Sequence, residues 1–148
     1  MLQLHYTKLN LETLSKIKIF VYGTLKPGEV NYHRYCAGRL VEEKPAIASG
    51  LLFHLSLGYP AMTLGDGKVY GYLLTFINSD ILMLLDELED YEPNRSPLEN
   101  EYNRQVLEIC DLEGRMLGSA WTYLMTDEQI QHHRGIPVTS GSWSSATR

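Results

Sequence analysis

A glutamate on the apolar side of a predicted helix is the first residue of this sequence that suggests chemistry. When a helix from Asn78 advances by about 100° per residue, Glu89 falls inside the apolar arc, Asp86 lies just outside it, and Glu87 projects from the opposite side. The arc consists of Ile81, Leu82, Leu84, Leu85 and Leu88. Either the helix frays before Glu89, or an arginine pairs with it, or its carboxyl group lies in a partly apolar cavity. In such a cavity, desolvation raises the pKa of a carboxyl group from about 4.3 toward neutrality, which suits a general base and acid.

The second candidate is the tetrapeptide Tyr22-Gly23-Thr24-Leu25, which follows a predicted strand. A strand that ends in a glycine-containing turn leaves several backbone N–H groups unpaired, and such groups form a cradle for anions. The alternative is an ordinary connection between a strand and a helix. The tetrapeptide lacks the glycine spacing of dinucleotide-binding and phosphate-binding loops, so nucleotide binding is not indicated.

Hydrophobic periodicity and turn residues predict the elements around the tetrapeptide. The β-branched and aromatic stretch Ile17–Val21 predicts the strand that precedes it. Residues 32–36 predict a short helix, which Gly38 stops. Residues 39–55 are extended, either as two strands or as one strand bent by a bulge.

An Asp-Gly pair marks a turn in the middle of the chain. Asp66-Gly67 lies between the apolar runs 61–64 and 69–76, which predicts a β-hairpin. Period-two alternation in the second run predicts a strand with one face against a core, and that face carries Tyr70, Tyr72, Leu74 and Phe76.

The second half of the chain predicts one helix and two further strands. Asn78 or Ser79 can cap the helix, which we expect to run to about Tyr91. Residues 102–110 and 115–125 resemble two strands joined by a turn. Several strands with few helices in one short chain predict an α+β fold, with a largely antiparallel sheet that can curl into a barrel.

Length and composition restrict the class of protein. The chain has 148 residues, 44% of them hydrophobic and 21% charged, which fits one globular domain. A formal net charge of -5 without a basic run argues against nucleic-acid partners. The longest apolar run, residues 81–85, is far shorter than the roughly 20 residues that span a bilayer. We therefore expect no membrane segment. Residues 1–15 lack a secretory signal, which predicts a cytoplasmic location.

Other catalytic sets are poorly supported. The serines near the C-terminus lack a nucleophile-elbow pattern, and the five histidines lack zinc-ligand spacing. Cys36 and Cys110 have neither metal-ligand nor redox spacing and are interpreted as small buried residues.

Several motifs together resemble the γ-glutamyl cyclotransferase-like family. The stretch from Phe20 to Gly28, with Asn31, resembles the first motif of the family, and Leu85-Asp86-Glu87-Leu88-Glu89 resembles the second. Further matches are Gly58-Tyr59-Pro60, Val69-Tyr70-Gly71, Tyr102-Asn103-Arg104, Trp121-Thr122-Tyr123 and Ser140-Gly141-Ser142-Trp143. Their order and spacing extend the resemblance over about residues 16–143.

The resemblance implies a small, mixed and largely antiparallel β-barrel with flanking helices. Its cavity holds a γ-glutamyl group between the glycine loop and a catalytic glutamate, which by motif position is Glu89. The implied substrate-binding residues are Tyr22, Gly23, Thr24, Leu25 and Tyr102. One departure is Asp90, where many relatives have glycine, and it is expected to narrow or charge the mouth of the cavity.

The implied reaction is an intramolecular cyclisation of a γ-glutamyl amide to 5-oxoproline, with release of an amine or amino acid. It needs no metal and no other cofactor, and its only expected partner is a small γ-glutamyl substrate. A non-catalytic module that holds an acidic metabolite or peptide in the same cavity is the alternative. An enzyme that trims a γ-glutamyl protecting group during biosynthesis of a secondary metabolite is a further possibility. We expect an N-terminal extension over residues 1–15, the domain over 16–143 and a flexible tail over 144–148.

Overall fold

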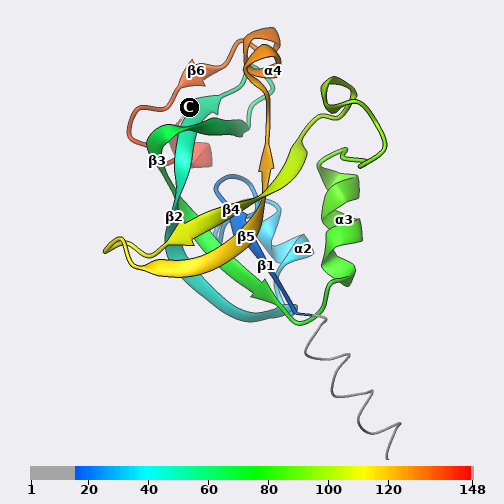
Figure 1. Ribbon diagram of the computed structural model, residues 1–148, viewed down its shortest axis with the longest axis vertical. Coiled ribbons are helices and arrows are strands. Elements are labelled where there is room, and N and C mark those ends of the chain that lie inside the picture. Colours follow the sequence, from blue (N-terminus) through cyan, green and yellow to red (C-terminus); the bar gives the residue numbers. More distant parts are fainter. Residues whose placement is uncertain (1–15, 148) are drawn as a thin grey trace, which may run out of the picture.

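The computed structural model describes residues 16–147, and its strands close into a ring (Figure 1). In spatial order the ring consists of β3 (Pro60–Phe76), β1 (Ile17–Val21), β5 (Met116–Leu124), β4 (Asn103–Cys110) and β2 (Leu40–His54), and β2 pairs again with β3. The short strand β6 (Ile136–Pro137) pairs with β2. Among the described strands, only β1 and β5 pair in parallel. The predicted α+β fold with a mixed, largely antiparallel barrel is therefore confirmed.

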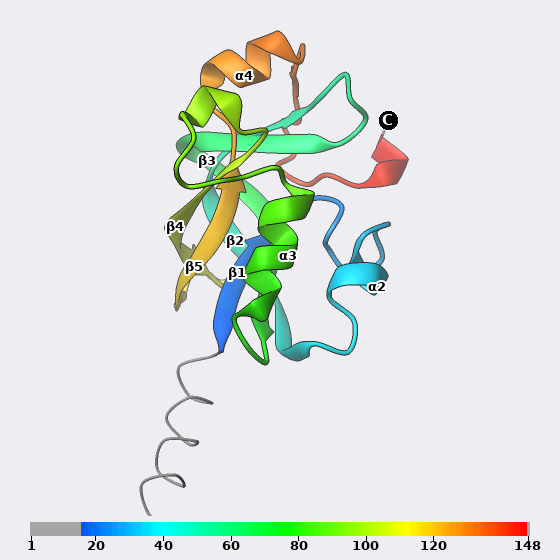
Figure 2. The same ribbon diagram turned by 90° about the vertical axis from the view of Figure 1, so that its right-hand side faces the viewer.

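The helices flank this ring (Figures 1 and 2). α3 (Asp80–Leu88) lies along its side, α4 (Asp127–His132) lies at one end, and α2 (Tyr32–Tyr35) follows the loop after β1. Two single turns of 3₁₀-helix, η1 (Pro97–Glu99) and η2 (Ser145–Thr147), complete the described elements. None of the helices within residues 16–147 is long and apolar enough to span a membrane. The expected N-terminal extension lies outside the described residues.

β1 is buried on both faces, which explains its nearly continuous apolar sequence. Ile19 and Val21 pack in one hydrophobic cluster with Ile81 and Leu85 of α3. The intervening side chains belong to a second cluster, made by the facing strands of the ring and the C-terminal segment: Phe20 and Tyr22 with Ala46, Ala48, Leu52, Met62, Val69, Leu73, Ile109, Ala120, Leu124 and Trp143. The molecule therefore has one core inside the ring and one between the ring and its flanking elements.

The extended segment 39–55 is one bent strand, β2, which runs beside β3 along most of its length. The turn between the two strands falls at residues 55–59, where the N–H of Gly58 donates to the carbonyl of Leu55 at 2.9 Å. Gly58 has a φ of 100°, which a glycine adopts without strain.

The predicted hairpin at Asp66-Gly67 is wrong, because both apolar runs belong to the single strand β3. The register jumps from Ser49 opposite Lys68 to Leu51 opposite Thr63, so the Asp-Gly pair lies in a bulge. Gly50 makes this bulge possible, since a Cβ atom there would lie 2.5 Å from the carbonyl oxygen of Thr63.

α3 begins at Asp80, as predicted, and ends at Leu88, before the predicted end near Tyr91. Asp90 turns the chain with a φ of 56°, in the left-handed region. Ile81 and Leu85 are buried, whereas Leu84 is 37% exposed and lies outside the core, contrary to the predicted apolar arc. The helix therefore ends just before Glu89, because tertiary contacts stop it earlier than its own sequence would.

The segment after β6 returns to the ring and closes it from outside. The carbonyl of Gly141 accepts the N–H of Tyr70 at 2.8 Å. Trp143 is 1% exposed and donates its Nε1–H to Nδ1 of His54 at 2.9 Å. The buried indole thus holds the chain end beside β2 and β3.

A substitution at Gly71 would test how closely β1 and β3 approach each other in the ring. A Cβ atom at Gly71 would lie 2.1 Å from the carbonyl oxygen of Val21 on β1. We expect Gly71→Ala to lower the free energy of unfolding by about 3 kcal/mol, the upper end for overpacking, in urea denaturation. Ser49→Ala, at an exposed position of β2, is the control and should change stability by less than about 0.5 kcal/mol. Equal stability of the two variants would contradict the close approach of β1 and β3.

Candidate active site

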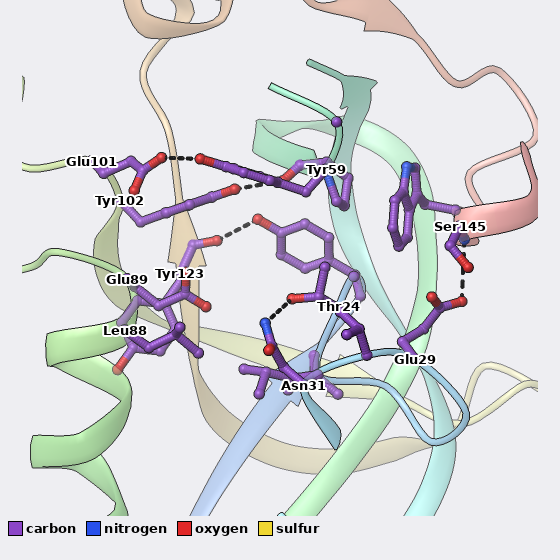
Figure 3. A pocket seen from close by; sticks show the side chains of 18 of the residues that line it. Thr24, Glu29, Asn31, Tyr59, Leu88, Glu89, Glu101, Tyr102, Tyr123 and Ser145 are labelled. Carbon is purple, nitrogen blue, oxygen red and sulfur yellow. Dashed lines mark hydrogen bonds between the residues drawn. The ribbon is translucent and has the colours of Figure 1, made fainter. Parts of the chain in front are cut away.

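A cavity of about 490 Å³ brings together all the residues predicted for the site (Figure 3). Its walls come from the loop after β1, the turn before β3, the end of α3, the segment before β4 and the C-terminal segment. The predicted residues that line it are Tyr22, Gly23, Thr24, Leu25, Glu89 and Tyr102. Glu89 and Thr24 approach the cavity from different elements in Figure 3.

Glu89 occupies the position directly after α3, and its side chain lines the cavity. Its N–H completes the last helical hydrogen bond, to Leu85 at 2.8 Å, and its carbonyl accepts the N–H of Tyr102 at 3.2 Å. Burial of the carboxyl group, and secondarily the negative charge of Glu101, raise the pKa of Glu89 from 4.5 to about 8. α3 ends before Glu89, as the first of the three explanations requires, but the carboxyl group is buried. Within residues 16–147 no arginine pairs with Glu89, and its carboxyl group faces the cavity.

The loop after β1 directs its carbonyl groups into its own turns. The carbonyls of Gly23 and Thr24 accept the N–H groups of Lys26 at 3.0 Å and Asn31 at 2.9 Å. Asn31 also donates its side-chain amide to Oγ1 of Thr24 at 2.9 Å. Within residues 16–147 the backbone N–H groups of Gly23, Thr24 and Leu25 make no backbone hydrogen bond. The loop therefore has the donors that an anion cradle requires.

Gly23 is required by packing as well as by its place in the loop. A Cβ atom at this position would lie 2.7 Å from Cγ of Pro60, which also lines the cavity. The side chain of Leu25 is 4% exposed and belongs to the core between the ring and its flanking elements. These two residues can therefore contact a ligand through their backbone.

Buried tyrosines form the uncharged part of the cavity wall. The Tyr22 hydroxyl donates to the carbonyl of Tyr123 at 2.6 Å and accepts the N–H of Met62 at 3.1 Å. Tyr102 donates to the carbonyl of Pro60 at 2.6 Å. Burial raises the pKa of each of these two phenols above its ordinary value. Their hydroxyl groups hold the fold together, so their rings are what they offer to a ligand.

An ion pair behind the cavity was not predicted. Arg104 donates Nε–H to Oδ1 of Asp86 at 2.8 Å and an amino group to Oδ2 at 3.1 Å. Its guanidinium lies 4.4 Å from the ring centroid of Trp121, and Tyr123 donates its hydroxyl to Oδ1 of Asp86 at 2.7 Å. The sequence signals for this contact were the position of Asp86 beside the apolar arc and the three motifs to which Asp86, Arg104 and Tyr123 belong.

Two acidic residues of the cavity were also missed. Glu101 accepts the hydroxyl of Tyr59, and both side chains line the cavity. Glu29 lines it near Ser145, whose N–H it accepts at 3.3 Å. Tyr59 belongs to a motif that supports the family resemblance, but neither glutamate has a periodic or motif signal.

Asp90 does not line the cavity, so the expectation that it narrows or charges the cavity mouth is wrong. It is exposed and pairs with Arg95 at 3.1 Å. Its positive φ explains why glycine suits this position.

Both cysteines are free thiols, and only one of them is buried, although both were expected to be. Cys36 is a buried free thiol, and Cys110 is free and half-buried. No group of three or more metal-ligating side chains occurs within residues 16–147.

The raised pKa of Glu89 predicts a pH-dependent cost to stability. Because the folded protein holds the proton to about pH 8 and the unfolded chain releases it near 4.5, stability falls as pH rises between these values. We expect Glu89→Gln to gain stability over wild type across this range, by at most about 1.4 kcal/mol per pH unit. Urea denaturation over the same pH range measures this difference. Glu87→Gln, at an exposed position of α3, is the control, and an identical pH dependence of the two variants would contradict the desolvation of Glu89.

Comparison with known proteins agrees with this geometry. Residues 19–145 match the family described as gamma-glutamyl cyclotransferase, AIG2-like. The chain is 32% identical over 106 residues to the gamma-L-glutamyl-butirosin B gamma-glutamyl cyclotransferase of Niallia circulans, a match that covers 72% of this chain and 65% of that protein. A Vibrio cholerae protein, provisionally named a gamma-glutamylcyclotransferase, is 33% identical over 129 residues, which cover 84% of this chain and 93% of the relative.

A solved structure supports the fold. The crystal structure of an AIG2-like protein from Mus musculus superposes with a TM-score of 0.64 at 22% identity, over 87% of this chain and 88% of that chain. The chain therefore belongs to the AIG2-like gamma-glutamyl cyclotransferase family.

Proposed function

We propose that the protein cyclises a γ-glutamyl amide to 5-oxoproline and releases the amine. The α-amino nitrogen of the substrate attacks its own side-chain carbonyl carbon, a new C–N bond closes the five-membered lactam, and the original amide C–N bond breaks. The α-ammonium nitrogen loses two protons and keeps one as the lactam N–H, and the leaving nitrogen gains two protons and departs as an ammonium group. No water is consumed, and no group is oxidised or reduced.

The observation that carries this proposal is the Glu89 carboxyl group facing the cavity opposite the N–H groups of the glycine loop. Burial brings its pKa to about 8, toward the range in which α-ammonium groups titrate, so a proton passes between them at lower cost than with an ordinary carboxyl group. The carboxylate takes the proton that blocks attack, and the resulting carboxylic acid returns it to the leaving nitrogen. A general acid-base pair matched in this way operates near neutral pH.

The N–H groups of Gly23, Thr24 and Leu25 are proposed to bind oxygen atoms of the substrate. A donor aimed at the developing oxyanion contributes roughly 3 to 4 kcal/mol to transition-state stabilisation. Donors that bind the α-carboxylate instead hold the substrate folded, with its nitrogen over its carbonyl, and such pre-organisation can contribute roughly 7 to 11 kcal/mol. Asn31 supports either role, because its two hydrogen bonds to Thr24 fix the loop.

The rings of Tyr22 and Tyr102 are proposed to enclose the aliphatic part of the γ-glutamyl group. Both are at least nine-tenths buried and line the same cavity as the glycine loop and Glu89. Apolar walls keep water from the carboxyl group, which preserves its raised pKa, and from the carbonyl, which favours cyclisation over hydrolysis.

The relatives support the reaction class and leave the amine open. The Niallia circulans relative is named for γ-glutamyl cyclotransferase activity on γ-L-glutamyl-butirosin B, and the match covers 65% of that protein. The competing proposal is a binding module that uses the same cavity without catalysis, and it predicts ligand binding with no 5-oxoproline.

Replacement of Glu89 tests the proposal directly. Glu89→Gln keeps the size and much of the hydrogen bonding of the side chain but cannot exchange a proton with the substrate. We expect it to fold, to bind a γ-glutamyl amide and to lose about 10² to 10⁴ in turnover. The measurements are 5-oxoproline release over a panel of γ-glutamyl amides, circular dichroism and calorimetric binding.

Glu87→Gln is the matched control for this experiment. Glu87 is exposed on the same helix and does not line the cavity, so its replacement should change turnover little. Wild-type turnover in Glu89→Gln would refute its catalytic role, whereas a wild-type protein that binds the amides without releasing 5-oxoproline would favour the binding module.

A further inference from the structure

The charges that line the cavity are all negative. Its ionisable side chains other than tyrosine are Glu29, Glu89 and Glu101, and within residues 16–147 no lysine, arginine or histidine lines it. Lys26 lies on the same loop as Glu29, but it donates its ammonium group to the carbonyl of Trp143. Arg104 is occupied by Asp86. A ligand in the cavity therefore meets carboxyl groups and no cationic side chain among the described lining residues, while the ammonium group of Lys26 acts on Glu29 from outside the lining.

Glu29 has a carboxylate oxygen that its surroundings do not satisfy. Oε2 accepts the N–H of Ser145 at 3.3 Å, whereas Oε1 is buried and has no hydrogen-bond partner among the described residues. The charge of Glu29 opposes the effect of burial on Lys26, whose pKa is lowered, yet no ion pair within 4.0 Å joins the two. A buried carboxylate oxygen without a donor is costly, and an ammonium group of a ligand would supply that donor.

Glu101 holds a second carboxylate beside the proposed catalytic group. The hydroxyl of Tyr59 donates to one of its oxygens, which fixes the side chain at the cavity wall. In Figure 3, Glu101 lies on the same side as Glu89, and Glu29 lies on the other side, beyond Thr24. Carboxylates thus flank the space between the glycine loop and Glu89 at both ends.

The γ-glutamyl part of a substrate cannot account for both carboxylates. It carries one α-ammonium and one α-carboxylate group and has no net charge, and the proposed function assigns its ammonium group to Glu89. The carboxylates of Glu101 and Glu29 therefore act on the amine part of the substrate. This part extends from the scissile bond toward the end of the cavity that holds one of these two residues. A second positive charge there would gain a charge-assisted hydrogen bond, and a negative charge would be repelled.

On the basis of the proposed function, we infer that the cavity selects γ-glutamyl amides whose amine part carries an additional positive charge, such as those of aliphatic diamines and polyamines. Glu101 and Glu29 are the specificity-determining residues. Amides that end in a methyl group are poorer substrates, and amides that end in a carboxylate are the poorest.

Three γ-glutamyl amides of matched length test this inference: those of 1,4-diaminobutane, pentylamine and 5-aminopentanoate, which differ in one terminal group. A hydrogen bond to a charged group predicts a kcat/KM for the diamine amide roughly 10-fold above that of the pentylamine amide, mainly through KM. This ratio should fall toward one in Glu101→Gln, in Glu29→Gln or in both. A ratio of the same variant on two substrates cancels general losses of activity or of folded protein.

Glu99→Gln is the control, since Glu99 is exposed, lies two positions from Glu101 and does not line the cavity. Its ratio should equal that of the wild type, which separates a local contact from the net charge of the protein. Equal kcat/KM values for the three amides, preference for the carboxylate amide, or an unchanged ratio in both glutamate variants would overturn the inference.

Calorimetric binding of the same three amides to Glu89→Gln separates this inference from the proposed function. Affinity in the order diamine, pentylamine, aminopentanoate supports charge selection even if wild-type protein releases no 5-oxoproline, and in that case the proposed reaction alone fails. If the wild-type protein turns over all three amides and Glu89→Gln binds them with equal affinities, the proposed reaction stands and the charge selection fails.

Discussion

Two backbone hydrogen bonds at the end of α3 hold Glu89 in place, and the geometry of the site depends on them. The N–H of Tyr102 donates to the carbonyl of Glu89 at 3.2 Å, and the N–H of Glu101 donates to the carbonyl of Asp90 at 3.1 Å. The last carbonyls of a helix need partners, and those of α3 accept the N–H groups of Glu89, Asp90 and Tyr91. The segment before β4 binds the carbonyls of the two residues that directly follow the helix. The same pairing brings the side chains of Glu101 and Tyr102 beside Glu89. The hydrogen bonds that follow the end of the helix therefore also build this wall of the cavity.

Elements whose signals are local were predicted from the sequence, and elements that depend on distant partners were not. The strand Ile17–Val21 and the short helix after the glycine loop follow from β-branched residues and turn residues within a few positions. Asp66-Gly67 carries a hairpin signal, but the space for a bulge there is created by Gly50 on the neighbouring strand. The end of α3 was misplaced for a similar reason, since no glycine or proline follows Leu88 until Pro93 and the contacts after Leu88 come from the segment before β4.

The predicted site residues line one cavity. They could be predicted because each belongs to a motif that is visible in the sequence of a single chain. Glu89 stood out as an acid within an apolar arc, and the glycine loop as a turn after a strand. Glu29 and Glu101 lie in irregular segments, where periodicity gives no direction for a side chain. Their place in the cavity follows from ring closure, which brings the loop after β1 and the segment before β4 to the same end of the molecule.

Asp86 and Glu89 lie three positions apart, and the fold gives them opposite surroundings. Asp86 binds the guanidinium of Arg104 and the hydroxyl of Tyr123, so its charge is compensated. Arg104 is then committed to that carboxylate and to the faces of Tyr91 and Trp121, and it is not available to Glu89. An arginine beside Glu89 would favour the carboxylate and lower its pKa, whereas burial beside Glu101 raises it to about 8. By holding the cation at Asp86, the ion pair keeps Glu89 able to exchange a proton near neutral pH.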